Sequence, residues 1–333
     1  MNKYLIFRTD RIGDLLITCP LITTIKKHLT NSRITLITSA KNYKYAQSFE
    51  IFDKIYVYPE KNLFDKIKFI HKLSKIKFDY TLILDGKERS IISSIFVKSA
   101  YKVAIITEKK LNLFFKFFKI DYIIDYDAKD IINVYQKSLF KCGISLDIDN
   151  FDFIKNKKDN NFSSFIKIKN FIHIHLNEKW FSKIYIKKYS DINPSFDDFV
   201  DFINILSEKG DVLISTGLID FDLLNLLKKK YFTKHSEKIY YKETVNSIIY
   251  LIYKPTLSDL ESLFRKSKIL ILCHSGIIHA ANSFNIKIID ILDENHYDWY
   301  RRWISYLKNY NFFYRVKFVD LKTKIVNHIA ALD

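Results

Sequence analysis

Two short turns in the sequence concentrate side chains that can move protons or bind anions. The first, RTDRIGD at residues 8–14, places Arg8, Arg11, Gly13 and Asp14 between an apolar run and an amphipathic segment. A carboxylate in the first turn of a helix is favoured by the helix dipole, so Asp14 is a candidate proton acceptor. An Asp that only caps the helix, beside solvated Arg residues, is the alternative.

The second turn, CHSGIIHAA at residues 273–281, places small residues where a strand-like run meets a helix-like one. The backbone N–H groups of Ser275, Gly276 and Ile277 would then be exposed at a helix N-terminus, which suits a phosphate group. His279 could donate a further hydrogen bond. A capping serine with a packed histidine is the alternative.

Neither turn contains a standard nucleotide-binding fingerprint. The sequence has no G-x-G-x-x-G and no G-x-x-x-x-G-K-[ST] at these positions. This argues against a dinucleotide-dependent enzyme and against a P-loop kinase.

Short apolar runs alternate with longer segments of helical spacing along the chain. In the first half the runs are YLIFR, RITLIT, KIYVYP, YTLILD and YKVAII, with helical segments at 15–29, 41–49, 63–76 and 90–99. Parallel strands need crossover helices, so this order predicts a parallel sheet with helices on both faces. A polar segment rich in Lys and Asn at 152–170 predicts a linker, and the alternation restarts at FIHIHL.

We therefore expect an α/β protein with two Rossmann-like, doubly wound domains facing a cleft. The predicted division is an N-terminal domain over 1–155, a C-terminal domain over 170–318 and a closing helix over 319–333. Ligands of doubly wound sheets bind at the carboxyl ends of strands, so the two turns are where chemistry is expected.

Composition indicates the class of protein but does not identify its binding partner. A chain of 333 residues with 48% apolar residues is long enough for two cores. The formal net charge of +17 favours anionic partners, although the Lys residues are dispersed. Cys19, Cys142 and Cys273 form no metal or disulfide pattern, and no apolar run reaches about 18 residues. We expect a cytoplasmic protein that is at most peripheral to a membrane.

Read together, the two turns resemble glycosyltransferase family 9, which contains the bacterial heptosyltransferases of lipopolysaccharide core assembly. The positions that match its opening motif are Arg8, Gly13, Asp14 and Pro20. Those that match its later motif are Ser275, Gly276, His279 and Ala281. Between them, Asp79, Asp85 and Gly86 resemble its mid-domain strand, and Lys179 with Trp180 resembles the Lys-Trp element that opens its second domain.

The sequence departs from the family pattern at one position. His274 stands where the family usually has an Asp that is associated with the donor sugar. The resemblance therefore leaves the donor sugar open, and a catalytically idle homologue remains an alternative. Asp220 and Asp222 lie near the place where the family often has an acidic residue on the nucleotide side.

The resemblance implies a glycosyltransferase B-type fold and an inverting transferase that needs no cofactor and no metal. The nucleotide-sugar donor, for which ADP-heptose is expected, would bind the second domain through Lys179, Asp222, His274, the N–H groups of 275–277, and His279. The acceptor, a lipid A or core oligosaccharide or another surface glycan, would bind the first domain. Asp14 would be the base, with Arg8, Arg11 and Gly13 beside it; Asp10 has no role in this interpretation.

Three other possibilities follow from the sequence. Asp125-Tyr126-Asp127 is a D-x-D string that could hold a metal, although a solvated loop is more typical of such a stretch. Residues 108–119, EKKLNLFFKFFK, place Phe and Lys residues at helical spacing and could contact an anionic membrane or form a core helix. A basic nucleic-acid-binding protein is the remaining alternative, disfavoured because no aromatic and basic recognition motif is present.

Overall fold

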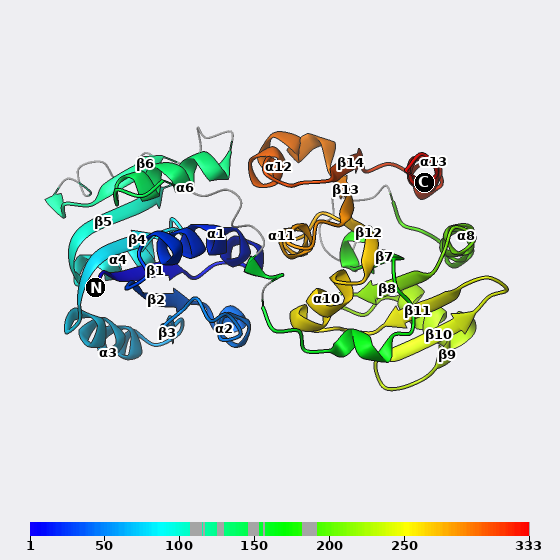
Figure 1. Cartoon of the computed structure of the whole chain (residues 1–333), viewed down its shortest axis with the longest axis horizontal. Coiled ribbons are helices and arrows are strands. Elements are labelled where there is room, and N and C mark those ends of the chain that lie inside the picture. The colour runs from blue at the N-terminus through cyan, green and yellow to red at the C-terminus, as the bar shows by residue number, and fades with distance from the viewer. Residues whose placement is uncertain are drawn as a thin grey trace. The chain divides into compact units, whose positions relative to one another are not determined.

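The chain folds into two compact α/β units (Figure 1). The computed structural model describes residues 1–106, 115, 117–124, 130–145, 153–155, 157–181 and 192–332. Unit 1 comprises Met1–Lys157 and Arg301–Tyr306, and unit 2 comprises Lys158–Tyr300 and Leu307–Asp333. The segment Arg301–Tyr306 lies within the range predicted for the second domain, yet it packs with unit 1.

Unit 1 is built on a parallel sheet of six strands, sheet A. Its strands are β1 (Lys3–Arg8), β2 (Arg33–Thr38), β3 (Lys54–Val57), β4 (Lys77–Ile83), β5 (Lys98–Ile106) and β6 (Asp121–Ile124), in the spatial order β3-β2-β1-β4-β5-β6. The central strand β1 is buried over most of its length because helices cover parallel sheets on both faces. This confirms the predicted doubly wound class for unit 1.

The helices of unit 1 are α1 (Ile12–His28), α2 (Ala40–Ala46), α3 (Leu63–Ser74), α4 (Glu88–Ile95) and α6 (Ile131–Phe140). Right-handed crossovers place α1 and α2 on one face of sheet A and α3 and α4 on the other, because the strand order reverses at β1. Consistent with this, α3 and α4 contribute to one apolar cluster with β1 and β4.

Unit 2 has a sheet of eight strands, sheet B. Its strands are β7 (Phe171–Leu176), β8 (Val212–Thr216), β9 (Thr233–Lys234), β10 (Ile239–Glu243), β11 (Ile248–Ile252), β12 (Ser267–Cys273), β13 (Lys287–Leu292) and β14 (Tyr310–Tyr314), in the order β14-β13-β12-β7-β8-β11-β10-β9. The alternation of runs did not predict that β10 pairs antiparallel with β9 and β11. Between β10 and β11 a tight turn, in which Thr244 N donates to Ser247 O, is too short for a crossover.

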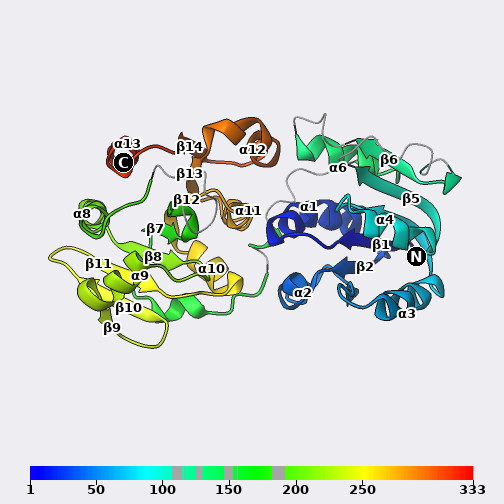
Figure 2. The same ribbon diagram turned by 180° about the vertical axis from the view of Figure 1, so that it is seen from behind.

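The helices of unit 2 lie in two groups. They are α8 (Phe196–Ser207), α9 (Asp222–Leu226), α10 (Leu257–Phe264), α11 (Ile277–Asn282) and α13 (Phe318–Ala330), whereas α12 (Tyr297–Ile304) begins in unit 2 and passes into unit 1 at Arg301. Short helical turns add η3 (Phe162–Phe165), η4 (Glu178–Trp180), η5 (Leu227–Tyr231) and η6 (Glu294–His296). Helix α8 contacts α13, α10 contacts α11, and Figures 1 and 2 show these pairs on opposite sides of the central strands.

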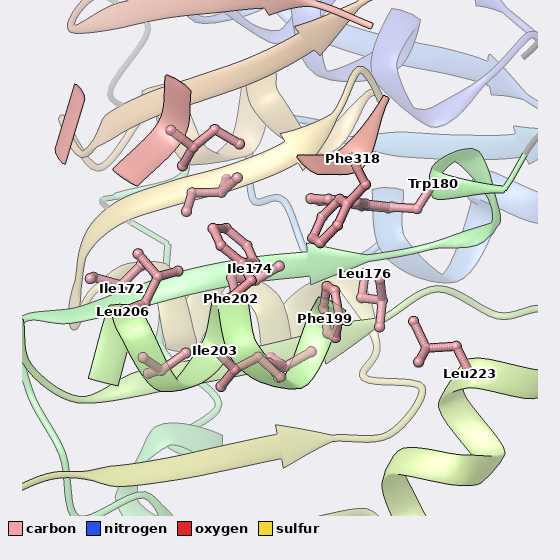
Figure 3. Close-up of a cluster of buried hydrophobic side chains, with 14 of the residues drawn as sticks. Ile172, Ile174, Leu176, Trp180, Phe199, Phe202, Ile203, Leu206, Leu223 and Phe318 are labelled. Atoms are coloured by element: carbon pink, nitrogen blue, oxygen red, sulfur yellow. The ribbon is translucent and has the colours of Figure 1, made fainter. Parts of the chain in front are cut away.

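The core of unit 2 anchors the turn that follows β7. Figure 3 shows Phe199 and Phe202 of α8 directed toward Ile174 of β7. Trp180, at the end of η4, is completely buried and packs edge-on against Phe199. Its indole N–H donates to His175 O over 3.0 Å. This anchor fixes the neighbouring Lys179 in place.

The parallel parts of the two sheets have the same strand order. Sheet B contains β11-β8-β7-β12-β13-β14, which repeats the order β3-β2-β1-β4-β5-β6 of sheet A. The order reverses at β1 and β4 in unit 1 and at β7 and β12 in unit 2. In such sheets ligands bind beside the turns at the reversal point.

Candidate active site

In unit 1, the turn after β1 is organised around a buried arginine. Arg8 is 3% exposed, and its guanidinium donates to Asp14 O over 2.9 Å, to Tyr135 Oη over 3.0 Å and to Leu84 O. Burial acts to lower the pKa of Arg8, but Asp10 above all, then Tyr135 and Asp14, outweigh it and raise that pKa above its usual value. Arg8 is thus a permanent cation that joins β1, β4 and α6.

Asp14 caps helix α1 and remains accessible. It is the third residue of the helix, and its Oδ2 accepts from Arg11 N over 3.2 Å. Its Oδ1 lies 3.7 Å from Arg8 Nη2, and the side chain is 25% exposed. The capping interpretation and the proton-acceptor interpretation are therefore compatible in one carboxylate. Gly13 is buried beside it, and Arg11 is exposed.

Asp10, which the sequence analysis left without a role, belongs to the same charge cluster. Its Oδ2 lies 3.3 Å from Arg8 Nη1, and its Oδ1 is buried without a hydrogen-bond partner among the described residues. Burial raises the pKa of Asp10 to about 7; Arg8 opposes the shift, whereas Asp14 and Asp85 add to it. The attraction of Arg8 does not outweigh the burial of the Asp10 carboxylate, so the anionic form of Asp10 is disfavoured.

The turn after β4 lies beside the turn after β1. Asp85 Oδ2 accepts from Thr9 Oγ1 over 2.6 Å and from Ser90 Oγ over 2.7 Å. Lys87 Nζ and Arg89 Nη2 both donate to Thr9 O, over 3.1 and 3.3 Å. These bonds bring two further cations to the point where the strand order reverses. Asp85 is one of the residues that match the family pattern, whereas no sequence motif marks Lys87 or Arg89.

In unit 2, a hydrogen bond links the turn after β7 to the turn after β12. Asn177 Oδ1 accepts from Lys179 N over 3.1 Å and starts the η4 turn. Lys179 Nζ donates to the carbonyl oxygen of His274, which follows the last residue of β12. The structure therefore brings together two residues that the sequence analysis assigned to the donor, 95 positions apart.

The rest of the second turn forms the start of α11. Ile278 N donates to Ser275 O over 3.2 Å, so the N–H groups of Ser275, Gly276 and Ile277 precede the first such bond. Ser275 Oγ is buried and has no partner in the described part of the chain. Burial, and secondarily His274, lowers the pKa of His279 to about 3, so His279 is a neutral, buried side chain.

His274 is part of a chain of polar groups across three strands. Its Nδ1 lies 2.6 Å from Asp290 Oδ2 on β13, and Tyr310 Oη on β14 donates to the same oxygen over 2.9 Å. The His274 ring also lies 4.3 Å, centroid to centroid, from that of Tyr300. Asp290 and Tyr310 were missed by the sequence analysis. The available signal was a single acidic residue inside the apolar strand sequence KIIDIL.

Asp222 lies on α9, a different element from this network. Asp222 is exposed in the first turn of α9, and none of the hydrogen bonds found in the described ranges links it to the 274–279 turn. Asp220 instead accepts from Lys254 Nζ over 2.6 Å and from Tyr253 Oη.

Two earlier expectations fall outside the described residues. The D-x-D string at 125–127 and most of the 108–119 segment are not among the residues that the structure describes. Within the residues that the structure covers, no group of three or more His, Cys, Asp and Glu side chains could hold a metal ion.

No family model matches the sequence, and no curated protein matches it. Solved structures do match over nearly the whole chain. A family 9 glycosyl transferase from Veillonella parvula is 13% identical, with a TM-score of 0.67, covering 99% of this chain and 89% of that one. The Escherichia coli ADP-heptose lipopolysaccharide heptosyltransferase II is 11% identical, with a TM-score of 0.68, covering 100% and 98%.

A protein of another class shares the architecture at lower similarity. UDP-GlcNAc 2-epimerase from Methanocaldococcus jannaschii is 11% identical, with a TM-score of 0.55, covering 99% of this chain and 92% of that one. The chain therefore has the fold of the family 9 glycosyltransferases and heptosyltransferases, as the sequence motifs indicated. Since a fold serves more than one reaction, the activity must be argued from the residues of the site.

Proposed function

We propose that the protein is an inverting glycosyltransferase that moves a sugar from a nucleotide-sugar donor to a glycan acceptor. This proposal depends on the side chains and backbone N–H groups that lie in the turns where the strand order of each sheet reverses. Unit 1 presents an accessible carboxylate, Asp14, held by a permanent cation. Unit 2 presents Lys179, His274 and the N–H groups of the 275–277 turn, which suit a diphosphate.

In the proposed reaction, the acceptor hydroxyl oxygen attacks the anomeric carbon of the donor. The bond from that carbon to the diphosphate oxygen breaks, and Asp14 takes the hydroxyl proton. The products are the glycoside, the nucleoside diphosphate and a protonated Asp14. Arg8 and Arg11 would orient Asp14 or contact an anionic acceptor, and no metal or cofactor takes part.

We propose ADP-heptose as the donor and a lipopolysaccharide core or related glycan as the acceptor. The support is the shared fold with a protein described as an ADP-heptose heptosyltransferase, together with the family motifs in both turns. His274 stands where the family usually has Asp, so any difference in donor sugar between this protein and the family would be expected to arise at this residue.

We further propose that the protein contacts an anionic membrane through an apolar and basic face of unit 1. The exposed apolar residues on this face, which we call the α3–α4 patch, are Leu63, Phe64 and Ile67 of α3, Ile92 of α4, and Phe96 next to it. Helix α3 also carries Lys66, Lys68 and Lys72. An apolar surface with lysines suits the headgroup region of anionic lipid. No described helix is long and apolar enough to cross a membrane.

The proposed activity is tested by transfer assays with a panel of nucleotide sugars that includes ADP-heptose. We expect Asp14→Asn to reduce transfer about 100- to 10,000-fold, the usual contribution of a general base, while ADP binding changes little. Asp259→Asn is the matched control, because Asp259 caps α10 from the same third position of a capping box. It should leave transfer nearly intact.

The outcomes separate the candidates. Near-normal turnover of Asp14→Asn would remove Asp14 from the mechanism. Nucleotide binding without transfer to any acceptor would indicate an idle homologue. Failure to bind nucleotides, together with salt-dependent binding of RNA or DNA, would favour the nucleic-acid alternative.

A further inference from the structure

The side chain of Tyr135, in α6, closes a ring of hydrogen bonds at the start of α1. Arg8 Nη2 donates to Tyr135 Oη over 3.0 Å, and Tyr135 Oη lies 3.2 Å from Thr18 Oγ1. Thr18 Oγ1 donates to the carbonyl oxygen of Asp14 over 2.8 Å, and Arg8 Nε donates to the same oxygen over 2.9 Å. The ring thus joins three side chains to the backbone of Asp14.

The direction of each bond in this ring follows from the number of protons available. The Thr18 hydroxyl has one proton and gives it to a carbonyl oxygen, which can only accept. Tyr135 must therefore donate to Thr18, and its oxygen accepts from the Arg8 guanidinium, which can only donate. Burial raises the pKa of Tyr135 to about 12, although Arg8 and Thr18 act to lower it, so the hydroxyl keeps its proton near neutral pH.

The position of Tyr135 is fixed by the residues around it. The side chain is 1% exposed, and a phenylalanine would fill the same space without burying a hydroxyl. Asp130 caps α6 by accepting from Ile132 N over 2.8 Å, and Ser305 Oγ donates to the same carboxylate oxygen over 2.8 Å. The helix that carries Tyr135 is thus anchored at its N-terminus, and the hydroxyl is a fixed acceptor for Arg8.

The same nitrogen of Arg8 lies near the carboxylate that is the proposed base. Arg8 Nη2 is 3.0 Å from Tyr135 Oη but 3.7 Å from Asp14 Oδ1, which is beyond hydrogen-bond distance. Asp14 Oδ2 accepts from Arg11 N, whereas none of the hydrogen bonds found in the described residues ends on Oδ1. Oδ1 is therefore the oxygen of this carboxylate that is open to a proton.

We propose that Tyr135 is a positioning residue for glycosyl transfer: its hydroxyl holds the Arg8 guanidinium where it attracts Asp14 without hydrogen bonding to Oδ1. This inference rests on the proposed function, in which Asp14 is the base. Without the hydroxyl, Arg8 Nη2 would lose its acceptor in a buried site and would turn to Asp14 Oδ1. That oxygen would then already be bonded when the acceptor hydroxyl arrives.

Steady-state transfer by the full chain, with the donor and acceptor that wild type uses, tests this role. Tyr135→Phe should lower kcat about 10- to 100-fold, the order expected when a catalytic group is slightly misplaced. The KM for the donor and the affinity for ADP should stay unchanged. A loss confined to kcat is the mark of an interaction that acts in the transition state and not in substrate binding.

Variants of Thr18 separate the ring from simple packing. Thr18→Val removes the hydroxyl to which Tyr135 donates and should also lower kcat, whereas Thr18→Ser keeps that hydroxyl and should retain the kcat of wild type. The double variant Tyr135→Phe with Thr18→Val should lose no more than the larger single loss, because the ring opens only once.

Tyr58→Phe is the matched control. Tyr58 is 3% exposed in unit 1, and its hydroxyl lies 3.1 Å from Ser93 Oγ, so this change removes a similarly buried hydroxyl outside the ring. It should leave kcat unchanged.

Crystal structures of wild type and Tyr135→Phe give a readout that does not depend on activity. The distance from Arg8 Nη2 to Asp14 Oδ1 should shorten from 3.7 Å to about 3 Å in the variant, which is the length of a hydrogen bond. An unchanged distance would contradict the inference.

The remaining results distinguish this inference from the proposed function. Transfer by wild type with an unchanged kcat in Tyr135→Phe overturns the inference and leaves Asp14 as the base. An equal loss in Tyr58→Phe, or a raised KM with unchanged kcat, overturns it as well. Absence of transfer by wild type with every donor and acceptor overturns the proposed function, and this role of Tyr135 with it. A lower kcat in Tyr135→Phe and Thr18→Val, but not in Thr18→Ser, supports the inference.

Discussion

At the scale of single residues, unit 1 places three acids, Asp10, Asp14 and Asp85, around the buried Arg8. Arg8 bonds to Tyr135 and lies 3.3 Å from Asp10 and 3.7 Å from Asp14. Because Asp14 is the more exposed acid and Asp10 the more buried one, their environments differ. Two carboxylates with different environments beside one cation are suited to different tasks, and only the accessible one is placed to meet an acceptor.

The raised pKa of Asp10 leads to a prediction about stability. Between about pH 4 and the folded value of about 7, the unfolded chain loses the Asp10 proton while the folded chain keeps it. The free energy of unfolding should therefore fall as pH rises through this window, by about 1.4 kcal/mol for each unit of pKa difference. Asp10→Asn removes the titration.

Urea unfolding of wild type and Asp10→Asn at several pH values between 4.5 and 8 measures this effect. The stability of the variant relative to wild type should increase toward pH 8 and shrink toward pH 4.5. Parallel curves for the two proteins would show that Asp10 is ionised in the folded state throughout, held by Arg8.

At the scale of elements, the position of Lys179 depends on how closely η4 approaches the end of β8. A Cβ atom added to Gly217 would lie 2.9 Å from Asn177 Cβ and 3.0 Å from Glu178 Oε2. Asn177 starts the turn that carries Lys179, and Trp180 anchors its other end. A glycine after β8 is thus required for the backbone contact that holds the donor side of the proposed site.

We expect Gly217→Ala to lower the free energy of unfolding by about 1–3 kcal/mol and to weaken ADP binding, because η4 must move. Gly143→Ala is the control. Gly143 has a φ of +72°, so alanine there is strained, but it lies in unit 1 and has nothing within 4 Å of an added Cβ. That variant should lose stability and keep its ADP affinity. Unchanged stability and affinity in Gly217→Ala would contradict the proposed dependence.

At the scale of the whole molecule, the chain is not divided at one point into two consecutive domains. Arg301–Tyr306, which begins within α12, packs with unit 1 although the residues on both sides of it belong to unit 2. Ser305 Oγ donates to Asp130 Oδ1 over 2.8 Å, and burial raises the pKa of Tyr306, with contributions from Tyr135 and Asp130. A fragment ending near Lys157 would lack these contacts, so binding experiments should use the full chain.

The α3–α4 patch gives a prediction for the whole protein. Wild type should co-sediment at low salt with vesicles containing phosphatidylglycerol and much less with pure phosphatidylcholine, because each lysine near an anionic surface contributes about 1 kcal/mol. Phe64→Ser combined with Ile67→Ser should reduce binding several-fold.

Phe140→Ser serves as the matched control for this patch. Phe140 is 78% exposed on unit 1 but belongs to α6 rather than to α3 or α4. It should leave vesicle binding unchanged. Equal binding by the double variant and wild type would place any membrane contact elsewhere, and no binding to anionic vesicles would remove the membrane proposal.

The sequence alone determined the alternation of elements and the residues that follow key strands. Its apolar runs at β1, β2, β4, β7 and β12 are local patterns, and a parallel sheet follows from the helices between them. Arg8, Asp14 and Ser275 could be recognised because each lies within a short motif of the turn itself. The antiparallel pairing of β10 could not, because a short apolar run does not reveal its partner.

Only the tertiary structure decided which distant residues meet. Lys179 reaches His274 because β7 and β12 are neighbours at the reversal of strand order, although 95 residues separate them. Asp290 and Tyr310 are ordinary positions in their own strands and gain a role only because β13 lies between β12 and β14. Sequence spacing encodes local structure, whereas contacts between strands depend on the order in which the sheet assembles them, and that order is set by packing across the whole unit.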